Sequence, residues 1–315
     1  MTKKQVTTKK IGVLMGGFSA ERDISVRSGL AIYQALQELG YHSSLIDVGK
    51  DIVNVLRKDK VKLAFLALHG GIGENGSIQG MLDVLGIPYT GSGVMASSIA
   101  MDKEVSKKIF IHSELNVAPY IVISRKSKSG GKKTAESHIT EIDFLLPWVV
   151  KPVSEGSSIG VCIVKQKEDM PAAVDKAFSF GKRVLIEKFI DGREVHIAVL
   201  GDKPIGGVEV RPSLEFYNYE AKYTSGLTEY VIPPEIEEET YLKTSEMALS
   251  AHKALGCSGA SRVDFRIDNG GTPYILEVNT LPGMTSTSLL LKIAGHAGIS
   301  FNDIVEEIIR LALKK

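Results

Sequence analysis

The chain has 315 residues, of which 43% are hydrophobic and 24% are charged. This length and composition are typical of a globular protein with two or three domains, and they exclude a disordered or fibrous chain. Because 38 basic residues face 37 acidic ones, the formal net charge is only +1. No strong field is present to hold nucleic acid or an anionic membrane surface, so we expect small-molecule partners.

Cysteine usage and the first residues indicate the compartment. Cys162 and Cys257 are the two cysteines of the sequence, and their spacing fits neither a disulfide framework nor a zinc site. The polar first ten residues are followed by an apolar run, residues 11–15, that is too short for a signal-peptide core. No apolar run is long enough to cross a bilayer. We therefore expect a cytoplasmic protein.

The first hundred residues alternate between strand and helix signals. Apolar runs typical of strands lie at residues 11–15, 44–48 and 63–68. A helix-like stretch joins the first two runs and ends near Gly40, where glycine can adopt the left-handed conformation that closes a helix. Its apolar residues at three-residue steps are Leu30, Tyr33, Leu36 and Leu39. This alternation predicts a doubly wound α/β domain.

A glycine- and serine-rich loop, residues 152–160, lies between a strand at 148–151 and another at 161–164. Such a loop can turn several backbone N–H groups toward one anion, although it lacks the Gly-Lys-Ser/Thr ending of a P-loop. Lys151 ends the strand beside it, and Lys103 is a second candidate point charge for a phosphate. A plain hairpin with solvated lysines is the alternative. The polar stretch before this hairpin, residues 125–134, is expected to be an exposed loop.

The run 184–190 and the polar residues after it are candidates for the edge of a purine pocket. Apolar side chains and backbone groups can hold the ring, while Glu187 or Glu194 accepts hydrogen bonds from the exocyclic amine or the ribose hydroxyls. By itself this pattern has low specificity.

The C-terminal half continues with strands at 195–200 and 205–211 and a loop rich in tyrosine and charge at 213–230. A helix with an acidic first turn follows Pro233 and Pro234 and ends at Gly256. The last helix carries an apolar stripe, Ile304, Ile308 and Leu311, which we expect in the core.

Residues 261–279 predict a hairpin that gathers polar side chains on one face. The turn is expected at 269–271, with Arg262 and Asp264 on one face of the first strand and Glu277 and Asn279 on one face of the second. The apolar residues expected on the opposite face are Val263, Phe265, Ile267, Tyr274, Leu276 and Val278. Hard oxygen ligands in such a cluster favour Mg²⁺ and leave room for substrate phosphates, whereas a solvated strand face is the alternative.

Seven sequence blocks, in one order, resemble the ATP-grasp superfamily and within it the D-alanine–D-alanine ligase family. They are residues 16–22, 68–76, 101–103, 151–160, 216–223, 262–264 and 277–285. The resemblance implies an α/β fold with an N-terminal doubly wound, Rossmann-like substrate domain at 1–100. Two α+β subdomains that sandwich ATP would follow, a central one at 101–187 with the phosphate loop and a C-terminal one at 188–315 with the metal site and a lid loop.

The implied activity is the ATP-dependent joining of two D-alanines for peptidoglycan precursor synthesis. ATP phosphorylates the carboxylate of one D-alanine, and the amine of the second attacks the acyl phosphate and expels phosphate. The resemblance implies ATP as co-substrate, Mg²⁺ or Mn²⁺ with two ions expected, and a homodimer formed through the N-terminal domain. Neither nucleic acid nor a membrane is an expected partner.

The resemblance also implies a role for each matching residue. Those expected at the chemical step are Glu21, Ser157, Tyr223, Arg262, Gly283 and Ser288, and those expected to hold substrate are His69 and Lys222. The expected ATP-binding residues are Lys103, Lys151, Glu155, Gly156, Ser158, Glu187, Lys188, Phe189, Ile190 and Glu194. The expected metal ligands are Asp264, Glu277 and Asn279.

The resemblance implies four of these roles in detail. Arg262 and the backbone N–H of Gly283 would stabilise oxygen charge on the tetrahedral intermediate. Glu21 would pair with the ammonium of the first D-alanine and be held by Ser157 and Tyr223. His69 would lie near the first substrate, and Ser288 and Lys222 near the carboxylate of the second. Without the resemblance, we would interpret Glu21 as a helix cap and His69 as a buried core histidine.

Two alternatives remain open from the sequence. One is a ligase of the same superfamily that uses another D-amino acid or a D-hydroxy acid as second substrate, although residues 219–223 resemble the loop of relatives that use an amine. The other is a nucleotide-binding relative without catalysis, which retention of Arg262 and the three metal-ligand candidates disfavours.

Overall fold

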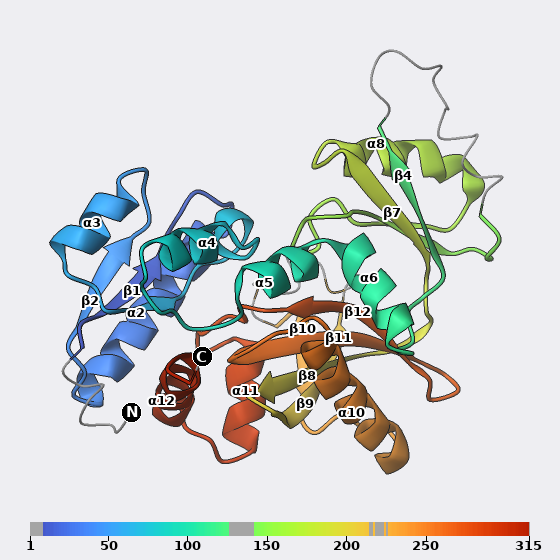
Figure 1. Ribbon diagram of the computed structural model, residues 1–315. Helices are drawn as coiled ribbons and strands as arrows, with labels where there is room; N and C mark the ends of the chain where they lie inside the picture. Colours follow the sequence, from blue (N-terminus) through green and yellow to red (C-terminus); the bar gives the residue numbers. More distant parts are fainter. Residues whose placement is uncertain (1–8, 126–141, 214–216, 218–223, 225, 315) are drawn as a thin grey trace.

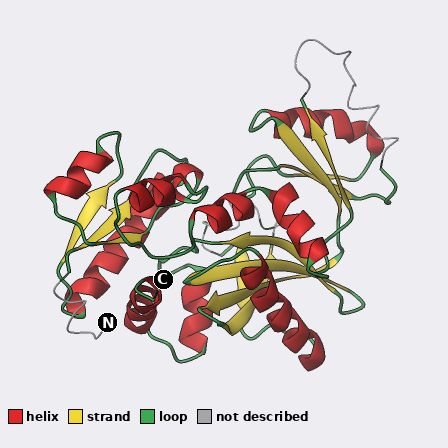
Figure 2. Ribbon diagram, in the orientation of Figure 1, coloured by secondary structure: helices red, strands yellow, loops and turns green. Residues whose placement is uncertain are grey.

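The computed structural model describes residues 9–125, 142–213, 217, 224 and 226–314. These residues form three β-sheets with helices packed on them, an α/β arrangement as expected (Figure 1, Figure 2). Residues of the expected polar loop at 125–134 other than Arg125 lie outside the described part of the chain, as do Lys222 and Tyr223. No helix among the described residues is long and apolar enough to span a membrane.

The first sheet is parallel, with β1 (Ile11–Met15) between β2 (Ser43–Asp47) and β3 (Leu63–Leu66). Alternation along β1 sends Ile11 and Val13 to one core and Leu14 to another. Helices α3 (Ile52–Lys58) and α4 (Ser77–Val84) contribute to the core of Leu14, and α2 (Arg22–Glu38) packs in the other. The three predicted strands are confirmed. Both faces of the sheet that they form are buried, as is usual for a parallel sheet.

The buried face of α2 differs from the row of three-residue steps seen in the sequence. Leu36 is buried, but Leu30 is 47% exposed, while Ile32 and Ala35 face the core. An α-helix has about 3.6 residues per turn, so a row with a period of three drifts around its surface. The helix is confirmed, but the row of three-residue steps does not mark its buried face.

The second sheet is antiparallel and has the order β4-β7-β5-β6. Its strands are β4 (Tyr120–Ser124), β5 (Trp148–Pro152), β6 (Cys162–Val164) and β7 (Arg183–Lys188). A short 3₁₀ turn, η2 (Lys167–Asp169), leads into α8 (Met170–Phe178), which covers one face. The glycine- and serine-rich loop joins β5 to β6, as the sequence predicts.

The third sheet is antiparallel, with the order β10-β9-β8-β11-β12. Its strands are β8 (Gly192–Leu200), β9 (Lys203–Pro212), β10 (Thr228–Val231), β11 (Ala260–Asp268) and β12 (Pro273–Asn279). Helix α10 (Glu238–Ala254) begins with two glutamates, as expected, and buries Met247 and Ala251 against Val263 and Phe265. Near the edge of this sheet lie α5 (Val94–Met101) and α6 (Lys103–His112), whose Phe110 enters the same core.

The expected hairpin of β11 and β12 is confirmed, but the face assignments of Leu276 and Tyr274 are wrong, since Tyr274 pairs with Arg266 on the polar side. A β-bulge shifts the register between Asp264 and Phe265, so that Asp264 pairs with Glu277 and Phe265 with Ile275. The unpaired extra residue is Leu276, and Ile275 is buried in the core in its place. Because the bulge interrupts the alternation, Leu276 lies on the same side as Glu277 and lines a cavity there.

The C-terminal helices return to the first sheet. Helix α11 (Leu289–His296) is followed by α12 (Phe301–Ala312), which starts with a reciprocal capping box between Ser300 and Asp303. Ile304 and Ile308 are buried as expected, and α12 lies beside α2 (Figure 1). The core that contains Val13 therefore joins the two ends of the chain.

Gly192 lies at the start of β8, where the chain passes from the second sheet to the third. A larger residue at this position tests how tightly that passage is packed. The φ of Gly192 is +139°, and an added Cβ would lie 2.0 Å from the carbonyl oxygen of Ile267. We expect Gly192→Ala to lower the free energy of unfolding by about 3 kcal/mol, because overlap with backbone cannot be relieved by a side-chain rotation. Urea titration measures this loss.

The matched control is Gly295→Ala in α11, where an added Cβ meets nothing within 4 Å. Alanine favours a helix by up to about 1 kcal/mol over glycine, so this variant should be neutral or more stable. Equal stability of the two variants would contradict the packing argument.

Candidate active site

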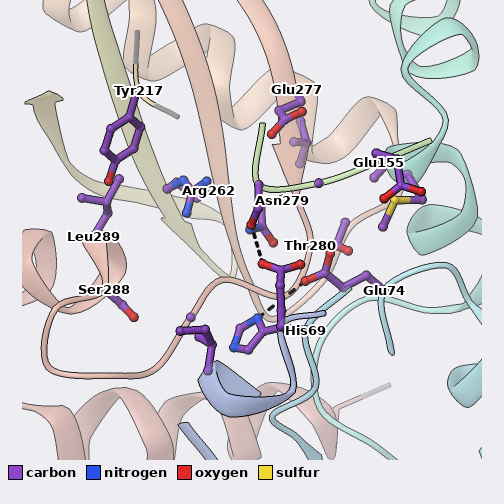
Figure 3. Close-up of a pocket in the computed structure, with 18 of the residues that line it drawn as sticks. His69, Glu74, Glu155, Tyr217, Arg262, Glu277, Asn279, Thr280, Ser288 and Leu289 are labelled. Atoms are coloured by element: carbon purple, nitrogen blue, oxygen red, sulfur yellow. Dashed lines mark hydrogen bonds and ion pairs between the residues drawn. The ribbon is translucent and has the colours of Figure 1, made fainter. Parts of the chain in front are cut away.

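Two adjoining cavities lie where the three sheets meet, and Lys103, Glu155, Tyr217 and Glu277 line both of them. The first cavity is mainly polar and is surrounded by Arg262, Glu277 and Asn279 from the third sheet, by His69 and Glu74 from loops after β3, and by Ser288 (Figure 3). The second lies between the second and third sheets, and its apolar walls include Val149, Ile163, Phe189, Ile190 and Leu276. Together they have the form of a ligand cleft with an apolar end and a charged end.

The polar face of the β11–β12 hairpin supplies the charged floor of the cleft. Register places Arg262 opposite Asn279 and Asp264 opposite Glu277. The opposite face of β11 is buried against α10, so these four side chains can point only toward the cleft. The two expected carboxylates and the amide are thus brought together.

Arg262 and His196 hold the carboxylate of Asp264 in place. Arg262 Nε donates to Oδ1 at 2.7 Å and its Nη2 to Oδ2 at 2.8 Å, while His196 Nδ1 lies 2.6 Å from Oδ1. Burial would raise the pKa of Asp264, but Arg262 and His196 outweigh this effect and hold that pKa well below its usual range. Asp264 is therefore an anion whose charge is already compensated.

Lys103 compensates the second carboxylate. Its Nζ lies 3.1 Å from Oε2 of Glu277 and donates to the backbone oxygen of Glu155 at 2.6 Å. These two contacts tie α6 to Glu277, a metal-ligand candidate, and to the phosphate loop.

The donor set on this floor suits a hard divalent cation. It contains two carboxylates and the carboxamide of Asn279, whose Oδ1 accepts from the backbone N–H of Leu281 at 2.9 Å. Among the described residues no group of three or more His, Cys, Asp and Glu could hold a metal by itself. The residues therefore fit Mg²⁺ or Mn²⁺ bound partly through ligand oxygens, in the manner of sites that share the ion with phosphates.

The loop between β5 and β6 is held in a strained conformation by contacts on both sides. Ser157 and Ser158 have φ values of +50° and +58°, a region that non-glycine residues rarely adopt. Ser157 Oγ donates to Oε1 of Glu21, and Ser158 Oγ donates to the backbone oxygen of Tyr217 at 2.9 Å. The loop thereby links the first sheet to the third across the cleft.

Glu21 and His69 line the first cavity. Glu21 stands at the N-cap of α2 but makes no side-chain cap hydrogen bond, so the capping alternative was wrong. His69 is buried, with Nε2 3.2 Å from Ser28 Oγ and Nδ1 3.6 Å from Glu74 Oε1. It is both a core histidine with partners and part of the cavity wall (Figure 3).

Gly283 and Ser288 meet in the wall of the same cavity, beside His69. A Cβ on Gly283 would lie 2.7 Å from Ser288 Oγ, so no larger residue fits without displacing that hydroxyl. Ser288 Oγ accepts from the backbone N–H of Thr285 at 3.0 Å. Lys222 and Tyr223, the remaining expected partners, lie outside the described residues.

The expected purine-binding residues line the second cavity, with Glu187 in an unexpected environment. The cavity is lined by Glu155, Ser158, Glu187, Lys188, Phe189, Ile190 and Glu194, and Gly156 lines the first cavity. Glu187 is only 1% exposed, and Lys107 and Lys151 each form an ion pair with it. Burial would raise the pKa of Glu187, but the two lysines lower it to about 2.

Four residues that line the cleft or support it from behind were not predicted from the sequence. Arg266 donates to the backbone oxygens of Ile190 and Gly192 at 3.0 and 2.8 Å, and it fixes the segment that crosses between the sheets. Its place two residues beyond Asp264 on the same strand face was a usable signal. Tyr217 lines both cavities, whereas Lys107 and His196 lie behind the cleft against Glu187 and Asp264, and the pattern along their own elements gave no such signal.

Family models match most of the chain. One described as the C-terminus of D-ala D-ala ligase matches residues 109–310, and one described as its N-terminus matches residues 52–92. A D-alanine–D-alanine ligase of Geotalea uraniireducens (strain Rf4) is 50% identical over 315 residues, covering 100% of this chain and 99% of that protein. That of Geobacter sulfurreducens is 48% identical over 310 residues, with 98% and 96% covered.

Solved structures are similar over nearly the same length. A D-alanine–D-alanine ligase from Bacillus anthracis complexed with ATP has a TM-score of 0.83 and 33% identity, with 98% of each chain covered. The VanG D-Ala:D-Ser ligase from Enterococcus faecalis has a TM-score of 0.82 and 31% identity, covering 96% of this chain and 99% of the other.

Glu187 should make the stability of the protein depend on pH. Its folded-state pKa is about 2 against an ordinary value of 4.5, so its stabilisation is complete above pH 4.5 and is lost as the pH falls toward 2. At neutral pH, Glu187→Gln should cost about 3 kcal/mol, because it leaves two buried ammonium groups without their counter-ion. Denaturant titration at several pH values measures the cost.

Glu229→Gln is the matched control, because the Glu229 side chain is 67% exposed. It should leave the free energy of unfolding within about 0.5 kcal/mol of wild type. A cost of Glu187→Gln that stayed constant between pH 7 and pH 3 would show that Glu187 is not anionic.

Proposed function

The chain belongs to the D-alanine–D-alanine ligase family, and we propose that its cleft joins two D-alanines into D-alanyl-D-alanine at the expense of ATP. The observation that carries this function is the meeting, in one cleft, of a phosphate loop with the cations Lys103, Lys151 and Arg262 and the carboxylates Asp264 and Glu277. ATP phosphorylates the carboxylate of the first D-alanine, and the amine of the second attacks the acyl phosphate. The tetrahedral intermediate then expels phosphate and forms the peptide bond.

The apolar end of the cleft is assigned to the nucleotide. Phe189 and Ile190 would hold the purine, with Lys188 and Glu187 at its edge and Glu194 near the ribose. Further ATP contacts are assigned to Glu155, Gly156 and Ser158 of the phosphate loop and to Lys103 and Lys151, whose charges offset those of the phosphates.

Asp264, Glu277 and Asn279 would hold Mg²⁺ or Mn²⁺, two ions being expected, which would neutralise charge on the ATP phosphates. Arg262, with the backbone N–H of Gly283, would stabilise oxygen charge on the intermediate. Arg262 uses two of its five N–H donors on Asp264 and lines the first cavity, so its remaining N–H groups can face a substrate oxygen while the pair with Asp264 stays intact.

The polar end of the cleft is assigned to the amino acids. Glu21 would pair with the ammonium of the first D-alanine and is already held by Ser157, with Tyr223 as a third member of the network. His69 would lie near the same substrate. Ser288 and Lys222 would bind the carboxylate of the second D-alanine, and the residues of the loop at 213–230 would cover the acyl phosphate and exclude water.

The division into units at 1–100, 101–187 and 188–315 is also proposed, with the three separate sheets as its support. A homodimer through the first unit is consistent with Val84 of α4 and Met95 of α5, whose apolar side chains are exposed. The proposed compartment is the cytoplasm, where ATP is at hand for a step in peptidoglycan synthesis.

Incubation with ATP, Mg²⁺ and D-alanine should release phosphate and form D-alanyl-D-alanine in equal amounts. Parallel reactions with D-serine and D-lactate as second substrates should yield less mixed product than dipeptide. Phosphate release that does not depend on D-alanine would argue for a different acceptor. Predominance of a product with D-serine would favour the D-Ala:D-Ser specificity for which the VanG relative is named.

Removal of either proposed metal-binding carboxylate should abolish most of the activity. We expect Asp264→Asn and Glu277→Gln each to lower kcat/KM about 100-fold or more, equivalent to roughly 3 kcal/mol of transition-state stabilisation. Steady-state kinetics over a range of Mg²⁺ concentrations measures the loss, and circular dichroism checks the fold. Glu229→Gln is the control, and activity near the wild-type level in Glu277→Gln would remove that residue from the site.

A further inference from the structure

Lys107 is a buried cation that the proposed mechanism does not use. It lies on α6, and its side chain has no exposed surface. Its Nζ is 2.9 Å from Oε2 of Glu187 and 5.5 Å from the centre of the Tyr120 ring. Burial lowers the pKa of Lys107, and the adjacent Glu187 carboxylate opposes that effect. An ion with so little solvent contact interacts strongly with whatever charge lies beside it.

Glu187 therefore sits between two ammonium groups. Lys151 Nζ lies 2.5 Å from Oε1 and Lys107 Nζ lies 2.9 Å from Oε2, so each carboxylate oxygen has its own lysine. Lys151 and Glu187 line the cavity assigned to the nucleotide, whereas Lys107 lies behind Glu187. One negative and two positive charges leave the triad with an excess of one positive charge.

The position of that excess charge matters for an anionic ligand. If Lys151 alone faced Glu187, the pair would be neutral, and the cavity would gain little attraction for phosphate from Lys151. Lys107 supplies the charge that balances Glu187, so the excess charge falls on Lys151 at the cavity wall. Lys151 lies near the end of β5, from which the phosphate loop begins.

We propose that Lys107 is a positioning residue that acts through Glu187 to keep the positive charge of Lys151 available to the phosphates of the bound nucleotide. This inference rests on the proposed function, because it takes a nucleotide as the ligand of the cavity. It assigns to Lys107 a part in nucleotide binding without any contact with the nucleotide.

Binding of ADP and of adenosine, measured by calorimetry at neutral pH and a fixed Mg²⁺ concentration, tests the proposal. Lys107→Met keeps an unbranched side chain, one atom shorter, and removes its charge. We expect the ratio of the ADP dissociation constant to that of adenosine to rise about tenfold, because only ADP carries phosphate charge. Lys107→Arg keeps the charge and should leave the ratio within about threefold of wild type.

The double variant Lys107→Met, Glu187→Gln separates a charge effect from a packing effect. It removes one positive and one negative charge, so Lys151 again carries the excess, and the ratio should return to within about threefold of wild type. Glutamine can alter purine contacts, but these affect both ligands and cancel in the ratio. If the ratio of the two dissociation constants in the double variant were as high as in Lys107→Met, the proposal would be overturned.

An unchanged ratio of the ADP and adenosine dissociation constants in Lys107→Met would also overturn the proposal, since Lys107 would then be neutral or without influence on Lys151. A loss of affinity for adenosine equal to that for ADP would assign Lys107 to the packing of the purine pocket instead. Failure of the wild-type protein to bind ADP at all would contradict the proposed function itself. The two ideas can thus fail separately.

Discussion

Burial of one face of the β11–β12 hairpin is the constraint from which the cleft follows. Val263, Phe265 and Ile275 must leave water, and α10 is the surface that covers them. Since strand side chains alternate, the burial of these residues turns Asp264 and Glu277 toward the opposite side. The free energy that holds these carboxylates side by side therefore comes from apolar contacts behind them, and the carboxylates themselves would repel each other.

Charge compensation resolves that repulsion. Arg262 balances Asp264, Lys103 balances Glu277, and two lysines enclose Glu187. Each of these cations has a proposed second task toward substrate or nucleotide, apart from the fully buried Lys107. Each of these carboxylates thus has a cation beside it, which limits the cost of desolvating so many charges in one place.

Contacts between distant parts of the chain bring the two ends of the cleft together. The Ser157–Glu21 bond joins the phosphate loop to the first sheet, and the Ser158–Tyr217 bond joins it to a residue beyond β9. The packing of α12 on α2 places the last helix against the first sheet. The proposed amino-acid and nucleotide ends can therefore act as one site, because the same loop contacts the walls of both.

The sequence by itself determined the elements and the polar face of the hairpin, because periodicity reports which side of one helix or strand is buried. The order of its motifs also determined the family. Only the tertiary structure decided that Lys107 meets Glu187, that Glu21 does not cap its helix, and that a bulge turns Leu276 toward the cleft. Such contacts join residues far apart in the chain or interrupt a regular pattern. They depend on how whole elements pack, which the spacing of residues along one element does not encode.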